Sequence, residues 1–319
     1  MNTLSIRLVA LVALAAVGCS TTKNPSKAYV GLFGDNSVAV IDTSTSKVLT
    51  TIPVTAPDGL VITPDGAKVY VSSNTTGIID VIDTTTDAVS KSITVGTAAA
   101  LPAGLAITQD GKHIVAAIQG DGKAAIIDTT TDEVVNSLAV GKAHNSAISE
   151  DGLTAYIASQ VATAPAIYLV SIPSAAAGAT YTLDKSPRAL AAVGGKLYVT
   201  VASFDSVEVL DAATGRPGTQ IPTGGSPHDI RPTIDGKRVL TVSQTMGDLE
   251  IIDPATGTIT GRVPTGKMPH WIALSSDGKL AYVTNEGDNN MVAIDLATQK
   301  VTKTISNIGA APRKIALQP

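Results

Sequence analysis

Cysteine is almost absent from this chain. Cys19 is the only cysteine among 319 residues, so no intrachain disulfide can form. Aromatic residues make up only 3% of the sequence, which argues against the stacking surfaces that bind single-stranded bases. The 23 lysines and arginines are scattered singly in a chain of net charge -4, whereas a nucleic-acid partner normally needs a basic stripe. We therefore expect no nucleic-acid partner.

Common motifs of nucleophilic and phosphate chemistry are also missing. The sequence contains no Gly-x-Ser-x-Gly segment and no cysteine after residue 19, so neither a nucleophile elbow nor a Cys/His pair is expected. The pair Gly224-Gly225 stands between predicted strands, whereas a phosphate-binding loop opens a helix. No segment after residue 27 is predicted to be helical, and Ala175-Ala176-Ala177-Gly178 is predicted to be a loop.

The N-terminus carries a short hydrophobic run. Arg7 precedes the apolar segment 8–17, which is shorter than the roughly 20 residues of a membrane-spanning helix and is typical of an export signal over residues 1–18. Its end, Ala16-Val17-Gly18-Cys19, resembles a bacterial lipobox. Cys19 would then be the lipidated first residue of the mature protein, and residues 19–27 would form the lipidated cysteine and a tether.

The residue after the cysteine suggests a destination. Ser20 resembles the sorting context of outer-membrane lipoproteins. We therefore expect an exported protein that contacts the membrane through Cys19. It would be lipid-anchored in the cell envelope, in the outer membrane, facing the periplasm or the cell surface. The alternative is an inert thiol at the edge of a cleaved signal.

A turn signature with the sequence Asp-x-x-Thr recurs at a near-constant period. Successive copies are 41, 45, 83, 42 and 42 residues apart, so the longest gap is two periods, with the missing copy at Ser171. Each Asp is expected to accept hydrogen bonds from amides two or three residues later, which predicts turns and not calcium loops. The copies begin at Asp42, Asp83, Asp128, Asp211, Asp253 and Asp295.

A second set of turns, mostly Asp-Gly, alternates with the first. Asp and Gly supply the positive φ angles of tight hairpins, and runs rich in Val, Ile, Thr and Tyr between the turns predict strands of about five residues. One period therefore holds four strands, and about 40 to 45 residues with four strands is the period of a propeller blade. These turns lie at Asp65-Gly66, Asp110-Gly111, Asp151-Gly152, Gly194-Gly195, Asp235-Gly236 and Asp277-Gly278.

The number of repeats predicts an all-β fold, a single seven-bladed β-propeller with four-stranded blades over residues 28–319. One blade is divided between the two ends of the chain. Residues 312–318 supply its innermost strand, and residues 28–52 supply its other three strands. Pairing the C-terminal inner strand with the N-terminal strands closes the ring and removes the sheet edges that an open array would expose.

The repeats resemble a known family. Tyr282-Val283-Thr284-Asn285, preceded by Ser276-Asp277-Gly278-Lys279 and followed by Val292-Ala293-Ile294-Asp295, resembles the YVTN-type propeller repeat of YncE-like proteins. Weaker copies begin at Tyr70, Tyr156 and Tyr198. The resemblance covers residues 28–319 and implies the propeller fold. It leaves function open, because that superfamily includes binding proteins, cell-surface proteins, lactonases and relatives of haem-carrying reductases.

One position in the repeat concentrates histidine and arginine. It lies eight residues before the turn glycine, at the start of the innermost strand, and three of the four histidines occupy it. Arg188 and Arg313 take this place by following Pro187 and Pro312. Because inner strands line the channel of a propeller, the column should form a ring around one mouth. The predicted ring is Asp58, Ala103, His144, Arg188, His228, His270 and Arg313.

The ring has three chemical interpretations. Two arginines and three histidines against one aspartate make an electropositive mouth, which would focus an anion there. The ring could line a water-filled channel that binds nothing. It could hold a small carboxylate or phosphate between Arg188 and Arg313, with histidines assisting. It could instead hold a transition metal or a metal-containing cofactor through His144, His228 and His270.

We expect a monomeric, non-catalytic platform that binds a ligand or an envelope protein at the channel face. One alternative is a lactonase-type hydrolase with a ring histidine as general base, although Asp58 is the only carboxylate in the ring. The other alternative is a carrier of a metal or haem-type cofactor. Nearby, Trp271 is expected to pack between blades. Asp229 and Arg231 are expected either to support His228 or to form a salt bridge between blades.

Overall fold

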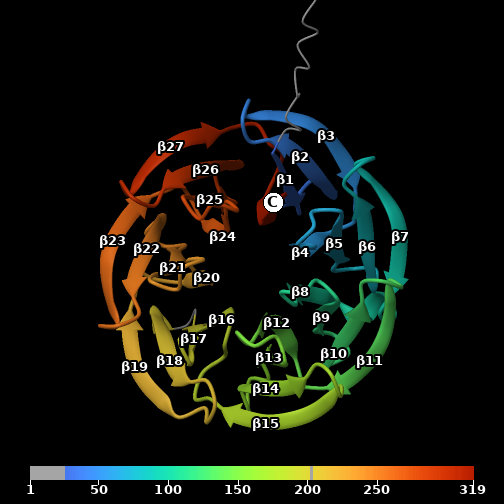
Figure 1. Ribbon diagram of the computed structural model, residues 1–319, viewed down its shortest axis with the longest axis vertical. Coiled ribbons are helices and arrows are strands. Elements are labelled where there is room, and N and C mark those ends of the chain that lie inside the picture. The colour runs from blue at the N-terminus through green and yellow to red at the C-terminus, as the bar shows by residue number, and fades with distance from the viewer. Residues whose placement is uncertain (1–25, 202–203) are drawn as a thin grey trace, which may run out of the picture.

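The fold is a closed ring of seven four-stranded antiparallel sheets, as the sequence predicts (Figure 1). The computed structural model describes residues 26–201 and 204–319. The predicted signal at 1–18, the lipidation site Cys19 and nearly all of the tether lie outside the described residues. Within the described part, a 3-10 helix spans Ala98–Ala100, and no helix is long and apolar enough to cross a membrane.

The four strands of each blade lie side by side and follow one another from the channel axis to the rim. The innermost strands are β4 (Pro57–Ile62), β8 (Pro102–Ile107), β12 (Ala143–Ile148), β16 (Leu190–Val193), β20 (Pro227–Pro232), β24 (Pro269–Leu274) and β28 (Pro312–Leu317). The second strands are β5 (Lys68–Ser73), β9 (His113–Ile118), β13 (Thr154–Ser159), β17 (Lys196–Val201), β21 (Val239–Ser243), β25 (Leu280–Asn285) and β1 (Lys27–Leu32).

The outer half of each blade holds its third and fourth strands. The third strands are β6 (Ile78–Asp83), β10 (Lys123–Asp128), β14 (Ala166–Ser171), β18 (Ser206–Asp211), β22 (Asp248–Asp253), β26 (Asn290–Asp295) and β2 (Ser37–Asp42). The outermost strands, which form the rim in Figure 1, are β7 (Ala88–Thr94), β11 (Glu133–Ala139), β15 (Ala176–Thr182), β19 (Pro217–Pro222), β23 (Thr258–Pro264), β27 (Lys300–Ile305) and β3 (Lys47–Pro53).

Blades are numbered here from β4–β7 as blade 1 to β24–β27 as blade 6, and the closing blade 7 has the strand order β28-β1-β2-β3. In blade 7 the two ends of the chain pair antiparallel, with Tyr29 opposite Ala316 and Val30 opposite Ile315. The predicted ring closure is therefore confirmed. The predicted loop at Ala175–Gly178 is wrong, because residues from Ala176 onward pair with β14 as the outermost strand β15. Small residues suit this position, since outermost strands are largely exposed.

The hydrophobic core lies between adjacent blades. Second strands such as β25 are buried along almost their whole length, whereas outermost strands such as β7 expose most residues. One cluster joins Ala28, Val30 and Leu32 of blade 7 to Trp271 and Tyr282 of blade 6. Each blade thus buries its apolar faces against its neighbours, which explains why one repeat cannot fold alone.

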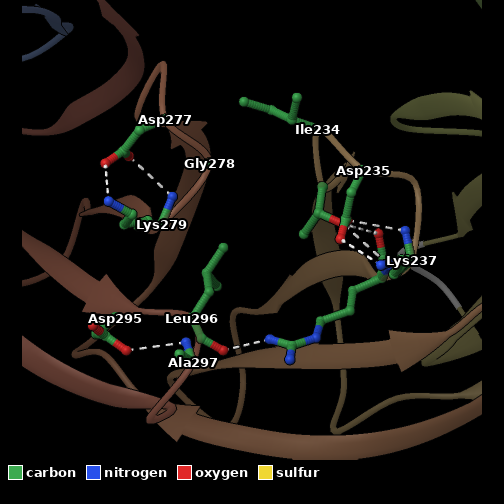
Figure 2. A pocket seen from close by; sticks show the side chains of 11 residues that line it. Ile234, Asp235, Lys237, Asp277, Gly278, Lys279, Asp295, Leu296 and Ala297 are labelled. Carbon is green, nitrogen blue, oxygen red and sulfur yellow. Dashed lines mark hydrogen bonds and ion pairs between the residues drawn. The ribbon is translucent and has the colours of Figure 1, made fainter.

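The two predicted sets of turns form as expected. Asp295 Oδ1 accepts hydrogen bonds from the amides of Ala297 at 3.0 Å and Thr298 at 2.7 Å. In the Asp-Gly turns the glycine takes a positive φ, +68° at Gly278, while Asp277 Oδ1 accepts from the amide of Lys279 at 3.1 Å. These polar groups meet in an inter-blade crevice of about 540 Å³ between blades 5 and 6 (Figure 2). Their hydrogen bonds serve the turns themselves, so the crevice is structural.

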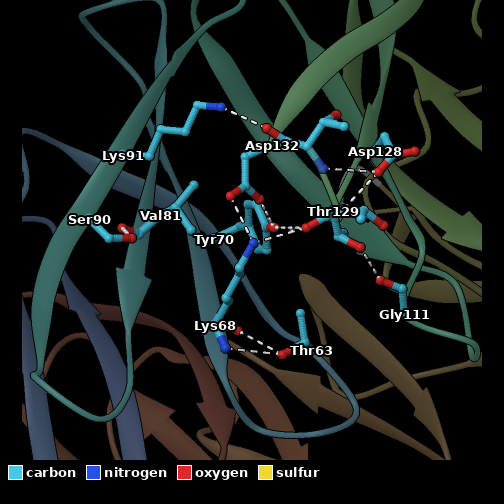
Figure 3. Close-up of polar contacts among 12 residues, drawn as sticks. Thr63, Lys68, Tyr70, Val81, Ser90, Lys91, Gly111, Asp128, Thr129 and Asp132 are labelled. Atoms are coloured by element: carbon cyan, nitrogen blue, oxygen red, sulfur yellow. Dashed lines mark hydrogen bonds and ion pairs between the residues drawn. The ribbon is translucent and has the colours of Figure 1, made fainter.

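The tyrosine of the repeat links one blade to the next (Figure 3). Tyr70 Oη donates to Asp132 of blade 2, and Lys68 Nζ lies 2.7 Å from the second oxygen of the same carboxylate. Lys68 Nζ also donates to the carbonyl oxygen of Thr129 at 2.9 Å. Blade 7 repeats the arrangement on blade 1, where Tyr29 Oη donates to Asp87 at 2.6 Å. The repeated tyrosine therefore stabilises the ring through side-chain contacts between blades.

Candidate functional site

A polar cavity of about 470 Å³ opens at the mouth where the innermost strands begin. This is the face opposite to the crevice of Figure 2, because each inner strand runs from the cavity toward its Asp-Gly turn. The structure brings the whole predicted ring to this cavity. The ring residues that line it are Asp58, Ala103, His144, Arg188, His228, His270 and Arg313.

The chain enters the inner strands in a strained conformation that repeats around the mouth. In five blades the residue before the first proline of the inner strand has a left-handed φ between 45° and 52°. Non-glycine residues adopt this region infrequently. The inner strands of adjacent blades also lie close together. A Cβ on Gly59 of β4 would lie 2.0 Å from the carbonyl oxygen of Ala103 on β8. The five left-handed residues are Ala56, Leu101, Ser226, Met268 and Ala311.

The two ring arginines differ in their partners. Arg313 Nε lies 3.2 Å from Glu286 Oε1, and its Nη1 lies 3.7 Å from Asp58 Oδ1. Arg188 has no carboxylate within 4 Å among the described residues, and its nearest polar side-chain partner is Gln244 Oε1 at 3.5 Å. Burial lowers the pKa of the Arg188 guanidinium, although arginine stays charged at all physiological pH. Arg188 is therefore a half-buried cation of the mouth that makes no salt bridge with a carboxylate of the described residues, although Glu286 stabilises its charge from farther away.

Two of the three histidines form a pair of rings in contact, tilted against each other. The rings of His228 and His270 have centroids 3.9 Å apart at an angle of 43°. They are 9% and 6% exposed, and the Nδ1 atom of each has no hydrogen-bond partner among the described residues. Burial holds the pKa of both well below the usual 6.5, and nearby cations including Lys314 and Arg188 lower it further. Both rings are therefore neutral at neutral pH.

The third histidine stands apart from this pair. His144 Nδ1 lies 3.2 Å from the carbonyl oxygen of Arg188, an acceptor that places the ring proton on Nδ1. Burial lowers the pKa of His144 as well. Among residues 26–201 and 204–319, no three His, Cys, Asp or Glu side chains come together in a way that could hold a metal ion. His144, His228 and His270 therefore do not form the metal site that the sequence suggested as one possibility. Arg188 lies between His144 and the other two histidines around the ring.

Sequence reasoning missed a second column of polar residues around the mouth. Each member directly follows the second strand of its blade, and the spacings repeat the blade period. The column supplies Glu286, a carboxylate whose Oε2 lies 3.8 Å from His270 Nε2. The repeat period itself was the signal that could have found it. The members that line the cavity are Asn74, Gln119, Gln160, Gln244 and Glu286.

Lys314 is the other residue that sequence reasoning missed. It follows Arg313 on β28, is 5% exposed and lines the cavity. Its Nζ lies 2.9 Å from the centre of the Trp271 ring, and Arg231 covers the same indole at 4.7 Å. Trp271 therefore packs between blades as expected, and it also borders the cavity.

Asp229 connects blade 5 to blade 6 next to Trp271. Its Oδ2 accepts from the backbone amide of Ile272 in the next blade at 3.0 Å and from Arg231 Nε at 3.3 Å. The salt bridge between Asp229 and Arg231 lies within β20 and not between blades as expected, while the hydrogen bond to Ile272 makes the contact between blades. Burial raises the pKa of Asp229, and Arg231 opposes that rise.

The paired histidines His228 and His270 make stability depend on pH. Their folded pKa values lie below the unfolded value of about 6.5, so below that pH the unfolded state binds more protons and stability falls as pH decreases. We expect each histidine to cost about 1 kcal/mol between pH 7.5 and 5.5. Denaturant unfolding at both pH values should show a smaller loss in His228→Gln and His270→Gln than in the parent. His113→Gln, outside the cavity, is the control, and an equal loss in all four proteins would contradict the assignment.

Comparisons with known proteins agree with the fold. A family model described as SMP-30/Gluconolactonase/LRE-like region matches residues 16–160, which is under half of the chain. No curated protein matches the sequence. The chain is therefore similar to that family over its N-terminal blades, while the narrower resemblance to YVTN-type repeats stays a prediction.

Several solved structures have a similar fold. Hydrazine synthase of Kuenenia stuttgartiensis is 23% identical, with a TM-score of 0.76 over 84% of this chain and 92% of that chain. A functionally unknown protein from Desulfotomaculum acetoxidans is 15% identical, with a TM-score of 0.78 over 91% and 98%. A putative 6-phosphogluconolactonase from Bacteroides uniformis is 16% identical, with a TM-score of 0.73 over 92% and 100%. At these identities the likeness shows the fold alone.

Proposed function

We propose that this protein is an exported, lipid-anchored envelope protein whose propeller binds a small anion at the channel mouth without catalysis. The observation that carries the proposal is Arg188, a half-buried cation that faces the cavity with no carboxylate partner. A carboxylate or phosphate would supply the charge that Arg188 lacks, and a guanidinium binds either group with two hydrogen bonds. The neutral imidazoles of His228 and His270 line the same cavity and add no negative charge to it.

The charges around the cavity favour an anion over a cation. Arg188, Arg313 and Lys314 line it together with two carboxylates, Asp58 and Glu286. Both carboxylates already lie within 4 Å of Arg313. The field at the opposite side of the mouth is therefore set by Arg188, on a protein whose overall charge is negative. Such a local contrast would concentrate a small anion at the mouth.

Calorimetric titration with phosphate, citrate and pyruvate tests this proposal. We expect at least one anion to bind with a single site per chain. Arg188→Gln should weaken that binding by about tenfold or more, because a charge-assisted pair contributes about 1.5–3 kcal/mol. The exposed Arg216→Gln is the matched control and should bind like the parent. Binding by the Arg188 variant at parental affinity, or no binding of any of the three anions, would refute the proposal.

The membrane anchor at Cys19 is a separate part of the proposal. It is supported by the lipobox-like segment 16–19 and by the single cysteine. Cys19→Ser should release the protein from the membrane fraction of the producing cell, and the parent should incorporate labelled palmitate. A parent protein that is fully soluble and unlabelled would contradict this assignment.

A lactonase-type hydrolase is the second candidate, and one contact favours it. Glu286 beside His270 supplies the acid partner that the sequence analysis did not find, with Nε2 and Oε2 3.8 Å apart. The likeness to the gluconolactonase-type family model points the same way. Hydrolysis of glucono-1,5-lactone above the spontaneous rate, lost in both His270→Gln and Glu286→Gln, would favour the enzyme. Parental turnover in both variants would exclude this pair from catalysis.

A further inference from the structure

Lys314 presents a buried amine to the cavity without a polar partner. The residue is 5% exposed and lines the mouth. No carboxylate lies within 4 Å of its Nζ among the described residues, and no described residue accepts a hydrogen bond from it. The Nζ atom packs on the face of the Trp271 ring, 2.9 Å from the ring centre. A lysine that is structural usually pairs with an acceptor, as Lys68 does with Asp132 in the same protein.

The charges around Lys314 favour its neutral form. Burial lowers its pKa to about 7, Arg231 and Arg313 push in the same direction, and Asp229 and Asp58 oppose them. Asp229 cannot neutralise the amine fully, because its Oδ2 already accepts from the Ile272 amide and from Arg231. The imidazoles of His144 and His270 also face this charge across the cavity. At neutral pH a large share of the molecules therefore carries an unprotonated, nucleophilic amine.

We propose that Lys314 captures small oxo acids covalently as an imine. The inference rests on the proposed anion site, because Arg188 lines the same cavity and would help to concentrate carboxylate-bearing ligands in it. A neutral amine on a residue that lines a cavity together with the cations Arg188 and Arg313 suits a carbonyl carbon next to a carboxylate. A simple carboxylate or phosphate would bind at the mouth without reacting. An aldehyde without an acidic group would lack the attraction of Arg188.

The reaction balances without a further reactant. The Lys314 nitrogen attacks the carbonyl carbon of the oxo acid, which forms a carbon–nitrogen bond and moves an electron pair onto the carbonyl oxygen. Two protons that leave the nitrogen are taken up by that oxygen, directly or through water. The carbon–oxygen bond then breaks and the oxygen departs as water, leaving a carbon–nitrogen double bond. Hydrolysis reverses each step, so the capture is reversible.

Reductive trapping tests this inference. The protein would be incubated with pyruvate and sodium cyanoborohydride, which delivers hydride to an imine carbon and leaves a stable secondary amine. Peptide mass spectrometry should find the adduct on Lys314 at least about tenfold above the exposed Lys237 and Lys279. Lys314→Met should lose this adduct and keep the background on Lys237. Arg188→Gln should slow the labelling of Lys314 without changing the background.

The pH dependence of labelling gives a readout that a structural role would not change. Trapping at Lys314 should increase between about pH 6 and 8, as its pKa of about 7 predicts, and then level off. Phosphate should slow the labelling of Lys314 by competing at Arg188.

The outcomes separate this inference from the anion site on which it rests. Pyruvate that binds by calorimetry but gives no Lys314 adduct would overturn the inference and leave the anion site intact. Uniform labelling of all lysines would also overturn it. Absence of both binding and adduct would refute the two proposals together. An adduct specific to Lys314 supports the capture whichever anion binds most tightly.

Discussion

Deleting residues 312–319 is expected to abolish the folded propeller. The deletion removes β28, the innermost strand of blade 7, and with it the buried Ile315 and Ala316. The loss of one buried isoleucine side chain alone typically costs about 2–5 kcal/mol, which is a large part of the stability of a typical domain. The deletion also leaves β1 as an open edge, so the truncated chain should aggregate.

Thermal unfolding followed by circular dichroism is the measurement. We expect the parent to unfold in one cooperative transition and the truncated protein to show none. Deleting only Gln318 and Pro319, which follow β28, is the control. It removes backbone and side-chain hydrogen bonds to Lys27 and Gly66 and should cost only about 1 kcal/mol for each bond. A protein without β28 that melts cooperatively near the parental temperature would show that closure does not hold this ring together.

Lys314→Met is expected to stabilise the protein at neutral pH by about 2 kcal/mol. The folded pKa of Lys314 is about 7, well below its value of about 10.4 in an unfolded chain. Between these two values the unfolded state binds more protons than the folded state, so stability is lost as pH falls from about 10 to 7. Methionine has a similar length and no charge to bury. It removes this penalty at the cost of the contact between the amine and Trp271.

Urea unfolding at pH 7.5 and pH 10 measures the effect. The advantage of Lys314→Met should be larger at pH 7.5 than at pH 10, because near pH 10 the unfolded lysine begins to lose its own proton and burial of the neutral amine then costs less. Lys237→Met is the control, because this side chain is 81% exposed and should show no such difference. Lower stability of Lys314→Met at both pH values would mean that the amine contributes more through Trp271 than its burial costs.

The repeats in the sequence were sufficient to predict the architecture. Asp-x-x-Thr and Asp-Gly turns are local signals, since each depends on a few neighbouring residues and on the φ angle that glycine allows. Counting them led to seven four-stranded blades and to the closing contact of residues 312–318 with 28–52, both of which the structure confirms. The strands of blade 3 were harder to predict from the sequence than those of the other blades. The outermost strand of blade 3, β15, begins with Ala176-Ala177-Gly178-Ala179, which has none of the β-branched residues typical of strands, and the pairing with β14 makes this segment a strand.

The same periodicity placed one ring of residues correctly and left another unnoticed. The column from Asp58 to Arg313 lines a single cavity, as its equivalent positions required. Whether its members bind a ligand is still a prediction. The residues after the second strands, including Gln244 and Glu286, obey the same period, but their side chains reach the mouth only because the second strand ends beside the start of the first.

The sequence by itself determined the blade count, the turns, the closure and the identity of the inner ring, because all of these follow from short-range patterns repeated at a fixed period. Only the tertiary structure decided the chemistry of the mouth. It pairs Arg313 with Glu286 and leaves Arg188 without a carboxylate. It also buries Lys314 against Trp271. These differences arise between side chains of separate blades, and the charge and pKa of a buried group depend on such neighbours in space.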